Sequence, residues 1–109
     1  MRILRFIVNE QIIEKDPNCN FEGLVPGSSS RIKAVFSFSP DWNSSVKVAS
    51  FRSMLGKEYP PQPLKDGYSC IIPPEALARR AFKVQIIGSI KGVGMVSTNK
   101  ITVEQNGGK

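Results

Sequence analysis

The chain alternates most regularly over residues 31–38, which read RIKAVFSF. Apolar side chains at every second position put one face of a strand on a core and the other face toward solvent. The core-facing positions of this stretch are Ile32, Ala34, Phe36 and Phe38. A period of two rather than 3.6 predicts a half-buried β-strand here.

The same period recurs on both sides of this stretch. It predicts strands at residues 1–8, 31–38, 46–52, 68–72, 82–87, 95–96 and 101–103. Turn-forming residues separate these runs, at 26–30, 40–41, 43–45, 57–63, 65–67, 88 and 92–94. Residues 73–78, PPEALA, carry the one helical signal, since proline and an early glutamate suit a first helical turn. We therefore expect an all-β, two-sheet sandwich of about seven to eight strands with one short helical turn.

The large apolar side chains indicate what fills such a sandwich. We expect the core to contain Phe36, Phe38, Phe51, Phe82, Val84 and Ile86. Trp42 has two interpretations, a plug in the core or an exposed aromatic anchor for a partner. The length of 109 residues predicts a single domain, with residues 105–109 as a flexible tail.

The charge of the chain bears on its partners. Its formal net charge is +6, and the positive residues are spread out except for Arg79, Arg80 and Lys83. Aromatic residues do not alternate with them as a nucleic-acid stacking platform requires, so an acidic protein partner or a solvated surface is favoured. Binding of that kind should weaken as salt rises. No apolar run reaches the 18 or so residues that span a bilayer, so we expect no membrane partner.

The residue types needed for catalysis are scarce. The sequence has no histidine, which removes the commonest general base, the Ser-His-Asp arrangement and most zinc sites. Residues 88–94, GSIKGVG, lack the order of a phosphate-binding loop and are better explained as a hairpin connection. We therefore expect no enzyme, no catalytic or metal-binding residues and no cofactor. Cys19 and Cys70 lie far apart without C-x-x-C spacing, and we expect reduced thiols rather than one bridge.

A wider pattern spans residues 31–104. It consists of Phe36-x-Phe38, Trp42, Lys47-x-Ala49-x-Phe51, Tyr59, Leu64-x-Asp66-Gly67-x-x-Cys70-x-Ile72-Pro73-x-Glu75-x-Leu77, Phe82-x-Val84-x-Ile86-x-Gly88 and Thr98-Asn99-x-Ile101-x-Val103. This pattern resembles the immunoglobulin-like module at the N-terminus of phage baseplate upper proteins, and also small stand-alone phage structural proteins. The resemblance implies an immunoglobulin-like sandwich in which Thr98-Asn99 forms a side-chain-bonded corner.

The resemblance also implies a function. We expect a bacteriophage virion structural protein, assembled in the host cytoplasm in many copies. The leading role is a capsid decoration subunit that binds and stabilises the shell of major capsid protein. The alternatives are a tail or baseplate adaptor and a small phage protein that binds a host factor.

Segments that depart from the family pattern are the candidates for partner binding. The prolines of 58–63 are stiff and follow an aromatic residue, so little chain entropy is lost on docking. On the N-terminal strand, two arginines flank apolar residues, and this strand offers pairing with a neighbour's sheet edge. The alternative is a rigid turn and an internal strand. The candidate residues are Arg2, Arg5, Tyr59, Pro60, Pro61, Pro63, Arg79 and Arg80.

Overall fold

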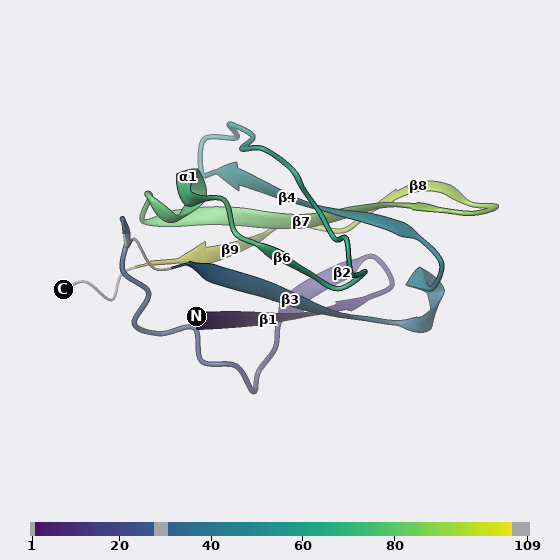
Figure 1. The fold of residues 1–109 in the computed structure, drawn as a ribbon, viewed down its shortest axis with the longest axis horizontal. Coiled ribbons are helices and arrows are strands. Elements are labelled where there is room, and N and C mark those ends of the chain that lie inside the picture. Colours follow the sequence, from purple (N-terminus) through teal and green to yellow (C-terminus); the bar gives the residue numbers. More distant parts are fainter. Residues whose placement is uncertain (1, 28–30, 106–109) are drawn as a thin grey trace.

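The computed structural model describes residues 2–27 and 31–105, which form a mostly β protein with two sheets and one short α-helix (Figure 1). The nine strands of this part of the chain are β1 (Arg2–Asn9), β2 (Ile12–Lys15), β3 (Ile32–Phe38), β4 (Val46–Ser53), β5 (Gln62–Pro63), β6 (Ser69–Ile71), β7 (Ala81–Ile90), β8 (Gly94–Ser97) and β9 (Ile101–Glu104). A short 3₁₀-helix, η1 (Pro40–Trp42), precedes β4, and α1 (Pro74–Leu77) joins β6 to β7. The predicted strands and helical turn are confirmed, while β2 and β5 were not predicted.

The first sheet has the strand order β2-β1-β3-β6. β1 is antiparallel to β2 and parallel to β3, with Arg2 opposite Ile32 and Val8 opposite Phe38. The loop after β2 adds one more backbone hydrogen bond to β1, from the Asp16 N–H to the Arg5 carbonyl at 3.1 Å. β1 is therefore an internal strand, as the alternative expected, but β2 covers only its second half, residues 6–9. Pairing of its first half with a neighbour's sheet edge stays a prediction.

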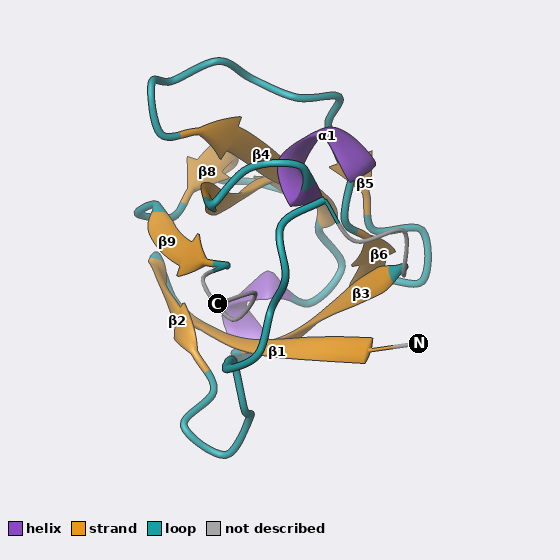
Figure 2. Cartoon of the chain, turned by 90° about the vertical axis from the view of Figure 1, so that its left-hand side faces the viewer, coloured by secondary structure: helices purple, strands orange, loops and turns teal. Residues whose placement is uncertain are grey.

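The second sheet has the order β5-β4-β7-β8, with β9 also paired to β7. β4 and β7 run antiparallel along their length, from Val46 opposite Ser89 to Ser53 opposite Phe82. The first half of β7 pairs with β9 and the second half with β8. Seen along the long axis of the molecule, the two sheets face each other, with α1 at the end toward the viewer (Figure 2).

The core lies between the sheets, as the alternating pattern predicts. Five of the six predicted core residues are buried: Phe36, Phe51, Phe82, Val84 and Ile86. Phe38 is only partly buried. It lies at the margin of the core, where the Lys47 ammonium sits 5.0 Å from its ring centroid in a cation–π contact.

Trp42 is a core plug rather than an exposed anchor. Its side chain is 1% exposed, and its indole N–H donates to the Glu10 carbonyl at 2.7 Å. Gly88 makes room for the ring, because a Cβ there would lie 2.6 Å from Trp42 Cζ3. The prediction of a turn at Gly88 is therefore wrong: this glycine lies inside β7, at a close approach rather than a bend.

Two further connections fix the sandwich. In α1, Ala76 and Leu77 are buried and close the core between β6 and β7. At the predicted corner, the Thr98 hydroxyl accepts from the Ile86 N–H at 3.0 Å and donates to the Asn99 carbonyl at 2.8 Å. The Asn99 side-chain amide pairs with the Ile13 backbone, accepting at 2.8 Å and donating at 3.3 Å, so it joins the two sheets. The predicted side-chain-bonded corner is confirmed.

The predicted flexible tail is wrong at its first residue, Gln105. Gln105 is 1% exposed and hydrogen-bonded, so it belongs to the folded part of the chain. Residues 106–109 of that tail, residues 28–30 of the predicted turn and Met1 lie outside the described residues.

Candidate protein-docking site

The connection after β4 forms a tight hairpin with an apolar tip. Ser53 N–H donates to the Lys57 carbonyl at 2.8 Å and its carbonyl accepts from Gly56 N–H at 3.0 Å. Gly56 has φ +95, a conformation that glycine adopts without strain and that typically ends a three-residue hairpin loop. The two residues at the tip are Met54, 47% exposed, and Leu55, 99% exposed. Hairpin tips are normally polar, so this tip is a candidate for contact with another molecule.

The connection between α1 and β7 carries two exposed arginines on a fixed backbone. The buried amide of Gln105 donates to the carbonyls of Leu77 at 3.0 Å and Arg79 at 2.7 Å. The Gln105 N–H also donates to the Arg80 carbonyl. Arg79 and Arg80 are themselves exposed, so their backbone is held in place while both guanidinium groups face solvent.

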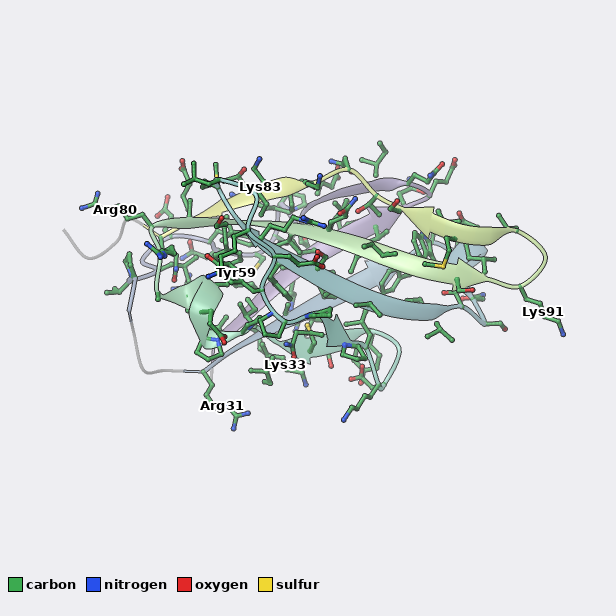
Figure 3. All side chains as sticks on the ribbon, turned by 90° about the horizontal axis from the view of Figure 1, so that it is seen from above. Arg31, Lys33, Tyr59, Arg80, Lys83 and Lys91 are labelled. Carbon is green, nitrogen blue, oxygen red and sulfur yellow. The ribbon has the colours of Figure 1, made fainter. Side chains whose placement is uncertain are left out.

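These two connections meet around a pocket of about 390 Å³, which we call the basic end pocket. The lining residues that matter here are Met54, Leu55, Lys57, Tyr59, Arg79 and Arg80. Tyr59 is only 7% exposed, since its N–H donates to the Phe51 carbonyl at 2.9 Å and its ring enters the core cluster. Figure 3 shows Tyr59 and Arg80 toward one end of the molecule and Lys91 at the other.

The electrostatics of the pocket are one-sided. Among the described residues, its lining carries three cations and no carboxylate. The nearby Glu58 is held by Arg52 at 3.5 Å, while within residues 2–27 and 31–105 Arg79 and Arg80 form no ion pair. Two unpaired guanidinium groups next to apolar side chains suit a ligand that is both acidic and apolar.

The predicted partner-binding residues fall into three groups, at the basic end pocket, on β1 and in the proline segment 60–63. Tyr59, Arg79 and Arg80 come together in the basic end pocket, although Tyr59 is a buried wall and not a projecting anchor. Arg2 and Arg5 lie elsewhere, on β1 of the first sheet. The Arg2 guanidinium donates to the carbonyls of Asn20, at 2.9 Å, and Glu22, so it holds the loop after β2.

The predicted prolines do not line the pocket. Pro60, Pro61 and Pro63 are exposed, and Pro63 lies in β5 at the margin of the second sheet, opposite Val48. Proline has no backbone N–H, so a proline-rich edge resists pairing with a further strand. At this place the prolines can protect the sheet edge from pairing with another strand. Their predicted role in docking stays a prediction.

The sequence patterns missed Met54 and Leu55. They follow β4 directly. The predicted strand ends at residue 52 and the next predicted turn begins at residue 57, so no feature was predicted for them. The available signal was the order Met54-Leu55-Gly56-Lys57, in which a glycine at the bulge position predicts a hairpin and leaves two apolar residues at its tip.

The cysteines lie outside this pocket. Cys19 and Cys70 are not paired in the described part of the chain. Burial, and then the negative charge of Asp66, raise the pKa of the Cys70 thiol to about 12. A thiol with such a pKa is a poor nucleophile at neutral pH, since the thiolate is the reactive form.

Across the described residues, His, Cys, Asp and Glu form no group of three that could hold a metal ion. Nor does any helix there have the length and apolar character needed to cross a membrane. In comparisons with known proteins, no family model matches the chain and no curated protein matches it.

Proposed function

We propose that this protein is a structural subunit of a bacteriophage particle, an immunoglobulin-like module that docks on neighbouring proteins through its basic end pocket. The observation that carries the docking site is the combination of a 99% exposed leucine with three cations around one pocket, none of them ion-paired among the described residues. Methionine, tyrosine and arginine are the types enriched at protein interfaces, and all three line this pocket.

Strand pairing supports the immunoglobulin-like assignment. β3 pairs with β6 in one sheet, and in the other β7 pairs with β4, β8 and β9, all antiparallel. Immunoglobulin domains join their B and E strands, and their C, F and G strands, in the same way. The parallel pairing of β1 with β3 departs from that arrangement.

Decoration of the capsid is the role we favour, with the major capsid protein as partner. The support is the sequence resemblance over residues 31–104 and the position of the pocket at one tip of a long module. A tip that is both apolar and basic fits an acidic, partly apolar surface on a shell. A tail or baseplate adaptor is the second candidate, because the sequence pattern resembles the baseplate module itself.

The test is occupancy on purified particles. The double variant Arg79→Glu with Arg80→Glu should lose occupancy, because reversing two contact charges costs several kcal/mol. The matched control is Lys65→Glu with Lys91→Glu, which makes the same change in net charge on exposed lysines outside the pocket lining. Mass spectrometry of cross-linked particles would name the neighbour as capsid or tail protein. Full occupancy of the Arg79 and Arg80 variant, with both proteins folded, would contradict the proposed docking site.

A further inference from the structure

A second hollow lies on the outer face of the first sheet, where β1 turns into β2. We call it the acidic end pocket. It has a volume of about 330 Å³ and is lined by Ile7, Asn9, Glu10, Ile12 and Glu14. Ile12 is 55% exposed and both glutamates are exposed. Within the described part of the chain, this lining thus has two carboxylates, two isoleucines and no cation.

This surface complements the basic end pocket in charge. One site presents the Met54-Leu55 tip with three cations around it, and the other is a hollow lined by two isoleucines and two glutamates. Leucine against isoleucine buries apolar area, while guanidinium and carboxylate groups form charge-assisted hydrogen bonds. Each site therefore has the chemistry that the other requires.

The two sites lie at opposite ends of the molecule. The β4–β7 pairing runs from Val46 and Ser89 at the η1 end to Ser53 and Phe82 beside the basic end pocket. The β1–β2 turn lies at the η1 end, because Trp42 in η1 binds the Glu10 carbonyl (Figure 1). One copy cannot satisfy both of its own sites, and contacts between unlike ends of identical chains propagate head to tail.

Both sites are held in place before any contact forms. The acidic end is fixed by Trp42 and by the Asn99 amide on Ile13, and the basic end by the Gln105 amide under Arg79. Little backbone freedom would be lost on association, which favours binding.

We infer that the basic end pocket of one copy binds the acidic end pocket of a second copy, so that chains associate head to tail. This inference rests on the proposed function, since it names a second copy as a partner for the same pocket. The Leu55 side chain enters the hollow between Ile7 and Ile12, and Arg79 and Arg80 face Glu10 and Glu14.

Charge reversal tests this directly. Sedimentation velocity is measured over a concentration series at about 0.15 M salt, where a Debye length of about 8 Å screens the net charges but leaves contact pairs. We expect the unaltered chain to associate with increasing concentration. Two variants, Glu10→Lys with Glu14→Lys and Arg79→Glu with Arg80→Glu, should each associate about 100-fold more weakly or not at all.

Mixing the two variants is the decisive arm. One retains the original basic end and the other the original acidic end, so an equimolar mixture should recover association that neither shows alone. The control Lys65→Glu with Lys91→Glu should associate like the unaltered chain. An unaltered chain that stays monomeric, a variant that associates normally, or a mixture that fails to recover would each overturn the inference.

Failure of this inference and failure of the proposed function give different results. The Glu10 and Glu14 variant keeps the basic end pocket, so it should still attach to particles as a single layer. If it attaches and the unaltered chain does not self-associate, docking stands and the head-to-tail contact is excluded. If the Arg79 and Arg80 variant loses self-association but keeps full occupancy on particles, the head-to-tail contact stands and the proposed docking site is excluded. Circular dichroism and melting curves establish that each variant is folded.

Discussion

At the η1 end of the sandwich Trp42 is buried and hydrogen-bonded, whereas at the α1 end Leu55 projects almost entirely into solvent. Both are large apolar residues in connections between strands, Trp42 between β3 and β4 and Leu55 between β4 and β5. The first fills the core beside Gly88, and the second adds nothing to the core that the fold requires. The contrast separates apolar residues that stabilise this protein from those available for contact.

Trp42→Ala should have the largest effect on stability. It removes a buried ring and the donor to the Glu10 carbonyl, and large-to-alanine changes of this kind cost about 3–5 kcal/mol. That is a large share of the stability of a small domain. Denaturant unfolding measures the loss, with Leu55→Ala as the control from the other end. A midpoint unchanged by Trp42→Ala would remove the contrast between the two ends.

Gly88→Ala should come next, at about 1–3 kcal/mol, because the new methyl group would overlap the Trp42 ring. The Val46 carbonyl, 3.2 Å from the added Cβ, limits relief by backbone movement. In a Trp42→Phe background the cost should fall, since the smaller ring vacates that space. A double-mutant cycle measures this coupling, which should exceed about 0.5 kcal/mol. Additive effects would show that the two residues do not constrain each other.

Asn99→Ala should cost about 1–2 kcal/mol, since it leaves the Ile13 backbone groups without their partner in a partly buried place. The change loosens the β1–β2 hairpin at the η1 end and leaves the α1 end untouched. Hydrogen exchange at the Ile13 amide reports it locally, with Lys100→Ala as the neighbouring control. Unchanged protection at Ile13 would show that the Asn99 amide does not join the sheets in solution.

Leu55→Ser should have the smallest effect on folding, within about 0.5 kcal/mol, because the side chain is already in solvent. The same change should weaken docking on particles and self-association, since it removes the apolar tip. A melting temperature lowered as much as by Gly88→Ala would mean that the tip belongs to the core after all.

The regular parts of the fold follow from the sequence because their cause is local. Apolar residues alternate in 31–38 and 82–87 because one face of each strand packs on the core and the other does not. Buried and less buried side chains alternate along β3 and β7 accordingly. β2 and β5 were missed because they have only four and two residues, too few to show an alternating pattern. They are strands because they pair with the longer β1 and β4. Gly88 was misread since a glycine at a close approach looks in sequence like a glycine at a turn.

The candidate site was only partly visible for a different reason. Arg79 and Arg80 stand out as an adjacent pair, but their meeting with Tyr59 depends on which loops share one end of the sandwich. That is a property of strand order, which periodicity does not report. The arginines of β1 suit an acidic partner equally well by residue type. The Arg2 guanidinium, however, donates hydrogen bonds to the carbonyls of Asn20 and Glu22 in its own chain.

The parallel pairing of β1 with β3 bears on how the chain folds. Hairpins such as β1–β2 and β7–β8 join neighbouring strands and form within about 1–10 μs. β1 reaches β3 only after the whole intervening segment has closed, and such non-local pairing slows folding to about milliseconds or longer. Until then the apolar face of β1, with Leu4, Phe6 and Val8, has no sheet to cover it. We therefore expect the entry of this strand to be one of the slow steps, together with the non-local β3–β6 and β4–β7 pairings. The hairpin that carries Glu10 and Glu14 would then form before β1 pairs with β3.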